Sequence, residues 1–342
     1  MFNWGIIGLG KIAHKFVEDL QKVPDARLYA VASRDLERSQ DFSLLYNAEK
    51  PFGSYEEIVT CQELDAVYIA TPHTGHFENS IMCLEHNIPV LCEKPLGMNA
   101  EQVHKMVSLA RFQETFLMEA MWTRFLPTIK KVLELIDSGI IGEVRTLKAD
   151  FGFAAERDPR SRVFNQGLGG GSLLDVGIYP VFLSLLLFGR PKSIRAAASI
   201  GPTNVDEDCA MILKFQGQKL AMLHSSIITN TKTEAVIYGE KGHIHIHPRW
   251  HELSSVSYEL NNGQSERFDF EYHCRGFSYE IQEAMDCIKG GRFQSDKMSH
   301  DFSLMLMKVL DDIRLQANIF YPLSDHFTDK EIATKANKFS QN

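Results

Sequence analysis

Residues 8–13, with the sequence GLGKIA, follow a short apolar run and open a stretch with helical spacing. This is the context that the Gly-x-Gly-x-x-Gly/Ala fingerprint of dinucleotide-binding folds requires. Gly8 permits the tight turn, Gly10 lets a pyrophosphate approach the backbone, and Ala13 allows close packing. The free N–H groups at the start of the helix can bind the phosphates. The motif therefore predicts a nucleotide-binding unit, with a purely structural glycine-rich turn as the alternative.

Short apolar runs alternate with helical patterns through the first third of the chain. Most of these runs are apolar throughout, as expected when helices cover both faces of a sheet. Such an alternation is typical of a doubly wound parallel sheet. The predicted strands are 4–8, 27–32, 66–70, 89–92 and 115–118; the predicted helices are 11–23, 75–87 and 99–113, the last opened by Asn99 and Gln102 at the spacing of a capping box.

Beyond about residue 125 the pattern changes to strands joined by short turns. The predicted strands are 144–153, 193–200, 209–215, 219–228, 234–238 and 243–247, with helices at 125–138, from 173, at 277–288 and at 300–317. We predict an α/β protein with an N-terminal Rossmann domain, a doubly wound parallel sheet, over residues 1–122. A C-terminal α+β domain over residues 123–342 would carry an open, mostly antiparallel sheet, bind substrate and mediate oligomerisation.

Composition and charge narrow the class of partner. The chain of 342 residues has 36 Lys+Arg against 44 Asp+Glu, a net charge of −8, so it lacks the positive surface expected of a nucleic-acid or anionic-membrane binder. Its six cysteines include no Cys-x-x-Cys pair, which favours reduced, buried thiols over disulfides or zinc. The most apolar stretch, 173–188, falls short of the roughly 20 residues that span a bilayer. With no signal-peptide pattern at the start, we expect a cytoplasmic protein that binds small molecules and other copies of itself.

Three histidines, His243, His245 and His247, alternate along one predicted strand and so lie on one face of it. No acidic or cysteine ligand accompanies them. We interpret them as part of a solvated sheet face and expect no metal site.

The end of the second predicted strand indicates which dinucleotide binds. An NAD enzyme places Asp or Glu there for the ribose hydroxyls, whereas this chain has Ser33 followed by Arg34. Arg34 and Arg38, four residues apart, could hold a 2′-phosphate with fork-shaped hydrogen bonds. We therefore expect NADP, with NAD less favoured. The alternative is an exposed arginine pair partly neutralised by Asp35 and Glu37.

Two further segments carry groups suited to proton transfer. Lys94 lies in the sequence EKP directly after a predicted strand, at the sheet edge where ligands of doubly wound folds bind. Asp175 and Tyr179 are four residues apart and would share a helix face, although Pro180 makes this spacing approximate. Taken on its own, that second segment equally fits a capping Asp175 and a half-buried core Tyr179.

In chain order, these motifs resemble those of the Gfo/Idh/MocA oxidoreductases, and most closely the branch of dimeric dihydrodiol dehydrogenases and NADP-dependent D-xylose dehydrogenases. The resemblance runs through GLGKIA at 8–13, ATP at 70–72, EKP at 93–95, EAMWTR at 119–124, GGGSLLDVGIY at 169–179, GFSYE at 276–280 and MKVLDDIR at 307–314. It covers almost the whole chain. Many members have His where this chain has Tyr179, a departure that fits the dihydrodiol dehydrogenase branch.

The resemblance implies that Lys94, Asp175 and Tyr179 form the catalytic group. Tyr179 would act as general acid/base, because a nearby lysine cation favours the phenolate of a group whose pKa is otherwise near 10. Lys94 would also polarise the reacting oxygen, and Asp175 would orient the substrate or the lysine.

The cofactor and substrate contacts follow partly from the motifs above and partly from the resemblance. The expected cofactor-binding residues are Gly8, Leu9, Gly10, Lys11, Ile12, Ser33, Arg34, Arg38, Thr71, Pro72, His73, His76, Glu93 and Lys94. Trp122 and Phe151 would form an apolar wall for the substrate beside Asp175 and Tyr179, or else belong to the plain core.

Together these features predict an NADP-dependent oxidoreductase. It would transfer a hydride between the nicotinamide and a secondary or hemiacetal hydroxyl, or the matching carbonyl, of a sugar, cyclic polyol or trans-dihydrodiol. Two alternatives stay open: a reductase of a 2-keto sugar or small dicarbonyl, and a non-catalytic NADP(H) sensor on the same fold. A homodimer or higher homo-oligomer through the C-terminal sheet is expected.

Overall fold

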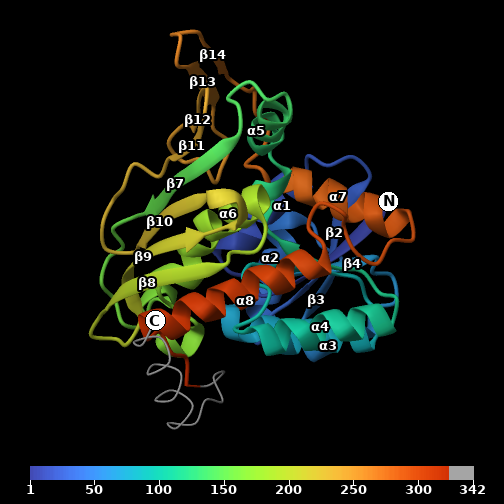
Figure 1. Cartoon of the computed structure of the whole chain (residues 1–342). Helices are drawn as coiled ribbons and strands as arrows, with labels where there is room; N and C mark the ends of the chain where they lie inside the picture. The colour runs from blue at the N-terminus through green and yellow to red at the C-terminus, as the bar shows by residue number, and fades with distance from the viewer. Residues whose placement is uncertain (323–342) are drawn as a thin grey trace. The chain divides into compact units, whose positions relative to one another are not determined.

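The computed structural model describes residues 1–322 and divides into two compact units (Figure 1). The first unit is Met1–Leu126 with Glu271–Leu304, and the second is Pro127–Phe270 with the chain from Met305 onward. The sequence-based division placed every residue after 122 in the second domain, whereas the structure puts 271–304 with the first unit. The reason is a cap: the buried carboxylate of Asp19 accepts the backbone N–H groups of Arg275, Gly276 and Phe277, each at 2.9 Å.

The first unit is built on a six-stranded parallel sheet in the order β3-β2-β1-β4-β5-β6. This is the strand order of the doubly wound dinucleotide-binding fold, so the predicted fold class is confirmed. The short edge strand β3 was not predicted. The strands are β1 (Phe2–Ile7), β2 (Ala26–Ala32), β3 (Lys50–Phe52), β4 (Ala66–Ile69), β5 (Val90–Glu93) and β6 (Leu117–Ala120).

Helices flank this sheet, with α3 and α4 lying side by side (Figure 1). Asn99 caps α4 as expected, because its side chain accepts the Gln102 N–H at 2.9 Å; Gln102 reaches back to the N–H of Met98 instead of that of Asn99. The α-helices are α1 (Lys11–Leu20), α2 (Leu36–Tyr46), α3 (His76–Glu85), α4 (Ala100–Phe112) and α7 (Phe277–Lys289), with single turns η1 (Glu56–Thr60), η2 (His73–Gly75) and η3 (Trp122–Phe125). Helix α8 (His300–Ala317) runs from the first unit into the second.

An aromatic cluster joins α1 and α7 to the sheet of the first unit. Phe16 of α1 stacks on Tyr68 of β4 with ring centroids 3.6 Å apart, and its edge meets Trp4 and Phe277. All four side chains are buried. Because such rings each bury a large apolar area, α7 is part of this core in spite of its distance along the sequence.

The second unit is an eight-stranded sheet in the order β14-β13-β12-β11-β7-β10-β9-β8. Only the β7–β10 pair is parallel, which agrees with the predicted mostly antiparallel sheet. The hairpin β13–β14 was not predicted. The strands are β7 (Val144–Gly152), β8 (Ser193–Ile200), β9 (Asp206–Lys214), β10 (Leu220–Ser226), β11 (Ala235–Gly239), β12 (Gly242–Ile246), β13 (Val256–Leu260) and β14 (Ser265–Phe268).

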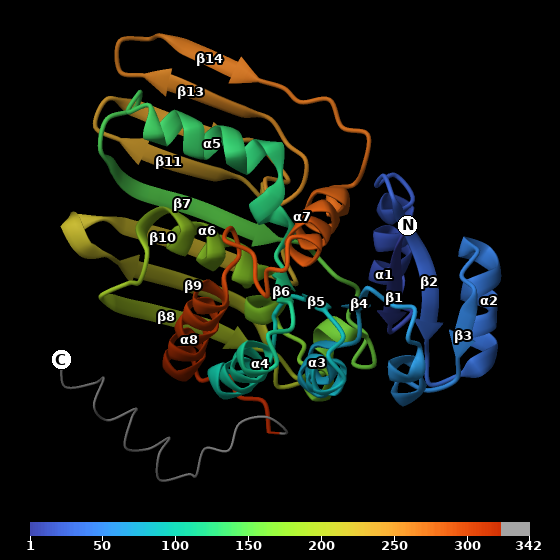
Figure 2. The ribbon, with the colours of Figure 1, turned by 90° about the vertical axis from the view of Figure 1, so that its right-hand side faces the viewer.

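Helices pack on one face of this sheet. Helix α5 (Pro127–Asp137) contacts β12 and β13, and Figure 2 shows it lying across this end of the sheet. The turn η6 (Leu173–Gly177) and helix α6 (Ile178–Phe188) contact β7 and β10. The helical stretch 166–188 is long and apolar enough to cross a membrane, but 83% of its apolar 18-residue window is buried inside the fold, as expected of a core helix. Single 3-10 turns lie at η4 (Arg162–Phe164), η5 (Gln166–Leu168) and η7 (Gln216–Gln218).

Candidate active site

The glycine-rich turn joins β1 to α1 in the first unit. Gly8 has φ +92°, and a Cβ there would lie 2.8 Å from the backbone nitrogen of Thr71, so only glycine fits. At Gly10 a Cβ would meet nothing within 4 Å. Helix α1 starts at Lys11 with no side-chain cap and no acidic residue in its first turn. The turn therefore presents uncapped N–H groups to open space, which is the arrangement that a pyrophosphate needs.

The end of β2 presents cations rather than an acid. Ser33 is buried, while Arg34 and Arg38 are exposed, and the Arg38 guanidinium donates a hydrogen bond to the carbonyl oxygen of Leu9 in the glycine turn. Asp35, which follows Arg34 in the sequence, caps α2 by accepting the N–H groups of Glu37 and Arg38. The Arg38 guanidinium therefore places a positive charge directly beside the glycine turn.

The segment after β4 is tied to the turn after β5 by His76. Its Nδ1 lies 2.7 Å from the carbonyl oxygen of Pro95 and its Nε2 lies 3.0 Å from that of Thr71. His76 is fully buried and the ring of His73 lies 5.8 Å from it. His76 thus holds two turns of the sheet edge together. Direct contact of Thr71, Pro72, His73 or His76 with a cofactor stays a prediction.

Lys94 directly follows β5 and precedes a cis proline. Its backbone N–H donates to Glu93 Oε2 at 3.2 Å, and the hydroxyl of Tyr68 donates to Glu93 Oε1. Glu280 of α7 is fully buried nearby, and burial, then the charges of Glu93 and Asp19, raise its pKa well above the usual range. Lys94 therefore lies at the end of a strand whose surroundings are rich in buried carboxyl groups.

In the second unit, Asp175 and Tyr179 lie on one continuous helical segment. Asp175 belongs to η6, which is π-helical, and Tyr179 belongs to α6. The wider π turn replaces the simple α-helical spacing that was expected, and such turns are frequent at functional sites. Gly177 lets this turn approach β10, because a Cβ there would lie 2.7 Å from Ser225 Oγ.

Asp175 is buried and forms an ion pair with Arg162, whose Nη2 lies 3.0 Å from Asp175 Oδ2. Arg162 is half exposed and comes from the turn η4, in a segment where the sequence offered no structural prediction. A planar guanidinium fixes the orientation of a carboxylate. Arg162 is thus a residue of this site that the sequence reasoning missed.

Tyr179 lies in a cluster of three rings. Phe151 of β7 and Tyr179 have centroids 5.6 Å apart, and His251 lies 3.9 Å from Phe151 and 5.3 Å from Tyr179. Phe151 therefore lies beside Tyr179 within this unit, and its role as part of a substrate wall stays a prediction. Trp122 belongs to the first unit, where it stacks on Phe277 at 4.7 Å.

His251 was not predicted, because no local pattern marks it. The loop that carries it is anchored by Trp250, whose indole N–H donates to the carbonyl oxygen of Asp150 at 2.9 Å. His251 Nε2 lies 3.4 Å from Glu252 Oε1. Burial pushes the pKa of Glu252 up, but hydrogen bonds from His251 and Arg249 outweigh it and bring the pKa to about 2. The charged carboxylate of Glu252 therefore contacts His251, whose ring lies beside Tyr179.

The three histidines on β12 and just after it are engaged in polar and ring contacts. His245 Nε2 lies 3.1 Å from Glu234 Oε2, His247 Nε2 lies 2.9 Å from Ser257 Oγ, and the ring of His243 lies 5.8 Å from Tyr238. Within residues 1–322, no three His, Cys, Asp or Glu side chains are grouped so that they could hold a metal ion.

Family models match both halves of the chain. The model GFO_IDH_MocA, described as "Oxidoreductase family, NAD-binding Rossmann fold", matches residues 2–121, and the GFO/IDH/MocA C-terminal domain matches residues 129–245. A trans-1,2-dihydrobenzene-1,2-diol dehydrogenase of Xenopus tropicalis is 35% identical over 332 residues, which covers 94% of this chain and 99% of the relative. The enzyme of the same name from Homo sapiens is 31% identical and covers 94% and 98%.

Solved structures share the fold at lower identity. The aldose-aldose oxidoreductase from Caulobacter crescentus superposes with a TM-score of 0.85 at 24% identity, covering 93% of this chain and 97% of that one. KijD10, a 3-ketoreductase from Actinomadura kijaniata in complex with NADP and TDP-benzene, has a TM-score of 0.84 at 24% identity and covers 92% and 98%. The family models and the near-full-length relatives agree with the motifs, and the chain belongs to the Gfo/Idh/MocA family of oxidoreductases.

Proposed function

We propose that this chain is an NADP(H)-dependent dehydrogenase or reductase acting on a secondary or hemiacetal hydroxyl, or the matching carbonyl, of a sugar, cyclic polyol or trans-dihydrodiol. The observation that carries the proposal is the uncapped amino end of α1, open at Gly10 and bordered by Arg38. When bound, NADP(H) supplies or accepts the hydride.

The preference for NADP rests on the charges beside the glycine turn. Arg34 and Arg38 are exposed cations at the end of β2, and the carboxylate of Asp35 is engaged as the cap of α2. A 2′-phosphate would gain charge-assisted hydrogen bonds from the arginines, whereas the position at the end of β2 where NAD enzymes place an acidic residue holds Ser33 and Arg34 in this chain. The NADP in the KijD10 structures agrees with this preference.

Three side chains are proposed to act on the reacting carbon and oxygen. Tyr179 exchanges the proton of the substrate hydroxyl, and Lys94 polarises the oxygen as negative charge develops on it. Asp175 orients the substrate, and the ion pair with Arg162 fixes the orientation of that carboxylate. This assignment is supported by the family membership and by the position of Lys94 at the carboxyl end of β5.

The substrate class is supported by the rings around Tyr179. Beside the Tyr179 ring, Phe151 offers an apolar surface and the His251 imidazole a polar one. This combination suits a flat or ring-shaped molecule that also carries hydroxyl groups. The names of the relatives, dihydrodiol dehydrogenases, fit the same description.

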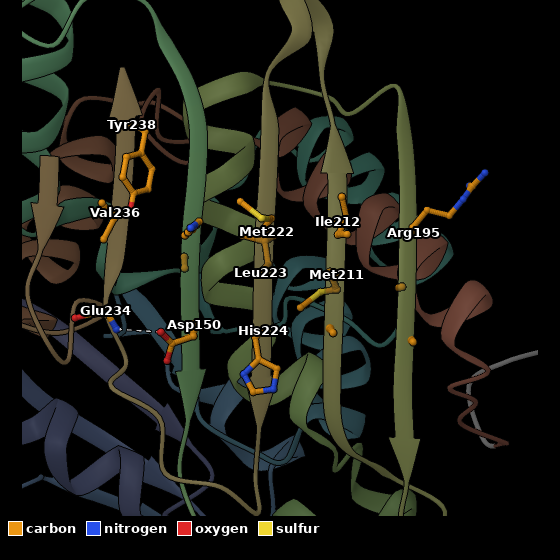
Figure 3. A pocket seen from close by; sticks show the side chains of 15 residues that line it. Asp150, Arg195, Met211, Ile212, Met222, Leu223, His224, Glu234, Val236 and Tyr238 are labelled. Carbon is orange, nitrogen blue, oxygen red and sulfur yellow. Dashed lines mark hydrogen bonds between the residues drawn. The ribbon is translucent and has the colours of Figure 1, made fainter. Parts of the chain in front are cut away.

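We propose in addition that two copies pair through the face of the second-unit sheet that lies opposite α6. A hollow of about 700 Å³ on this face is crossed by one register row, Arg195, Ile212, Met222, Lys148 and Val236 (Figure 3). The Ile212 side chain is 50% exposed. Asp150 and Glu234 line the same hollow, so its apolar residues are flanked by charges of both signs, which suits a self-complementary two-fold contact. Light scattering should show a dimer that Ile212→Glu dissociates; a monomeric wild-type chain would refute the pairing.

The function is tested by an NADP(H)-coupled screen of xylose, glucose, inositols, trans-diols and dicarbonyls in both directions. We expect turnover of at least one class, with Tyr179→Phe and Lys94→Met each losing about 10²-fold or more in kcat while NADPH still quenches tryptophan fluorescence. NADPH binding without turnover on any of these compounds would favour a sensor over an enzyme.

A further inference from the structure

The chain that follows α8 packs against a turn of three glycines, residues 169–171, which leads into the segment of Asp175. Tyr321 is only 2% exposed, and its hydroxyl donates a hydrogen bond to the carbonyl oxygen of Gly170 at 2.7 Å. The neighbouring carbonyl oxygen of Phe320 accepts a second hydrogen bond from the Gln166 side chain at 2.8 Å. Two hydrogen bonds therefore tie residues 320 and 321 to the glycine turn and to the residues just before it.

The end of α8 holds the Tyr321 ring from the other side. The N–H of Ile319 donates to the carbonyl oxygen of Arg314 at 2.9 Å and closes the end of the helix. The Arg314 guanidinium lies over the Tyr321 ring, 5.3 Å from its centroid, and donates to Asp311 at 2.6 Å. A cation over an aromatic face is attracted to it, most strongly where water is excluded. Tyr321 thus joins two elements of the second unit, α8 and the glycine turn.

The glycine turn lies directly on the backbone of the turn that carries Arg162. The Gly171 N–H donates to the carbonyl oxygen of Val163 at 2.9 Å, and a Cβ on Gly170 would lie 2.6 Å from the carbonyl oxygen of Arg162. Only glycine allows so close an approach. After Gly171 the chain leads into η6, which carries Asp175. The glycine turn therefore connects the backbones of the two residues whose side chains form the ion pair at 3.0 Å.

We propose that Tyr321 is a positioning residue for Asp175. By fixing the Gly170 carbonyl group, it holds the glycine turn against the Arg162 backbone, so that the ion pair between Arg162 and Asp175 keeps its geometry. A shift of about 1 Å at a reacting group, even one that starts far from the chemistry, can cost about 10²-fold in rate. The importance of Asp175 for turnover rests on the proposed function, whereas the effect of Tyr321 on the ion pair is independent of it.

Chemical modification of Arg162 measures the ion pair in the full chain without cofactor. Phenylglyoxal adds to the two terminal nitrogens of a guanidinium, and one of these in Arg162, Nη2, donates to Asp175. Mass spectrometry compares Arg162 with Arg27, an ion-paired arginine of the first unit whose side chain is equally exposed, at 42%. Tyr321→Phe keeps the ring but removes the hydroxyl donor. We expect its Arg162 to react about 3- to 10-fold faster than in wild type, the range that corresponds to the loss of one hydrogen bond.

Tyr258→Phe is the matched control for the loss of a buried tyrosine hydroxyl. Tyr258 is buried in β13 of the same unit, where its hydroxyl donates to Glu266 at 3.2 Å, and β13 packs against β12, β14 and α5. This variant should leave the modification rate of Arg162 unchanged. Asp175→Asn, which removes the charged partner, gives the rate of an Arg162 whose ion pair is broken.

A second variant covers the case in which Tyr321→Phe does not fold. Gln166→Met removes the hydrogen bond to the Phe320 carbonyl group and leaves Tyr321 in place. It should also speed the modification of Arg162, because it releases the same segment from the glycine turn. Modification of Arg162 at the wild-type rate in the folded variants would overturn the inference.

Turnover distinguishes positioning from a purely structural role. With a substrate from the screen above, Tyr321→Phe should lower kcat about 3- to 10-fold and leave the apparent KM for NADPH unchanged, because the cofactor turn belongs to the first unit. Tyr258→Phe should keep the kcat of wild type. Faster modification of Arg162 without any fall in kcat would show that Tyr321 has no part in positioning Asp175 for the reaction.

The same measurements separate this inference from the proposed function. If Tyr179→Phe loses turnover while Tyr321→Phe matches wild type in both modification and kcat, Tyr321 has no positioning role and the proposed function stands. If no compound turns over, the proposed function fails, and the modification rate of Arg162 still decides whether Tyr321 holds the ion pair.

Discussion

Replacing Asp206 with asparagine should make the protein more stable, and the gain should grow with pH. Asp206 is fully buried at the start of β9, where its Oδ2 accepts the Ser172 hydroxyl at 2.8 Å and the Leu173 N–H at 2.7 Å. It thereby anchors the amino end of η6, which carries Asp175. Gly171 is required beside it, since a Cβ there would lie 2.2 Å from Asp206 Oδ1.

The size of the effect follows from the cost of the buried charge. Burial raises the pKa of Asp206 from 3.8 to about 7, in spite of the hydrogen bonds from Leu173 and Ser172. Between these pH values the folded state keeps the proton that the unfolded state has lost, so stability falls as pH rises through this window. Three pKa units correspond to about 4 kcal/mol, complete above pH 7. Asp206→Asn mimics the protonated acid and removes this loss.

The assay is urea unfolding of wild type and Asp206→Asn at pH 4.5, 6 and 8. Taking the difference between the two proteins cancels the titration of other groups that the variant leaves unchanged. The difference should be small at pH 4.5 and should favour the variant by up to about 4 kcal/mol at pH 8. Asp269→Asn, an exposed surface change in the same unit, should differ from wild type by less than about 1 kcal/mol at each pH. A stability difference for Asp206→Asn that is independent of pH, or that favours wild type at pH 8, would show that the buried Asp206 charge does not destabilise the fold.

Three further predictions concern the glycine turn, the proposed 2′-phosphate site at Arg34, and the ion pair between Arg162 and Asp175. Gly8→Ala should lose about 1–3 kcal/mol of unfolding free energy, because alanine would be strained at this positive φ and would contact Thr71 too closely. Gly10→Ala should keep the stability of wild type but weaken NADPH binding. Equal unfolding free energies for the two variants would contradict this prediction. Arg34→Ala should raise the apparent KM for NADP about tenfold or more with little change for NAD, measured with the same substrate, and equal effects would remove the 2′-phosphate assignment. Arg162→Ala should lower kcat while NADPH affinity, followed by tryptophan fluorescence, stays constant, because it removes the guanidinium that orients Asp175; unchanged kcat would exclude that role.

The parallel sheet could be predicted because its strands are buried on both faces and therefore read as apolar runs. The same reasoning missed α2, whose Leu44 and Leu45 side chains are 80% and 62% exposed and so hide its buried face. The hairpin β13–β14 did leave a signal, the alternation of 256–260 followed by Asn262 and Gly263, which is typical of a turn.

The candidate site could be predicted only where a residue belongs to a local motif. Gly8, Gly10 and Lys94 follow strands in recognisable contexts, and Asp175 and Tyr179 share one segment. His251 and Arg162 have no such pattern: His251 meets Phe151 across a separation of 100 residues, and Arg162 lies in a turn without regular structure. The approach of α7 to the first sheet depends on Asp19, a cap supplied from 257 residues away.

Hydride transfer by this chain is measured by following deuterium from NADPH labelled at C4 into a carbonyl substrate. The dideuterated cofactor is incubated with the wild-type chain and the sugar and dicarbonyl panel, and mass spectrometry counts deuterium bonded to carbon in the products. We expect one deuterium per NADPH oxidised, and a loss of about 10²-fold or more in the transfer rate of Tyr179→Phe at equal NADPH occupancy. Bound NADPH that gives no labelled product, or a Tyr179→Phe variant that transfers as fast as wild type, would contradict it.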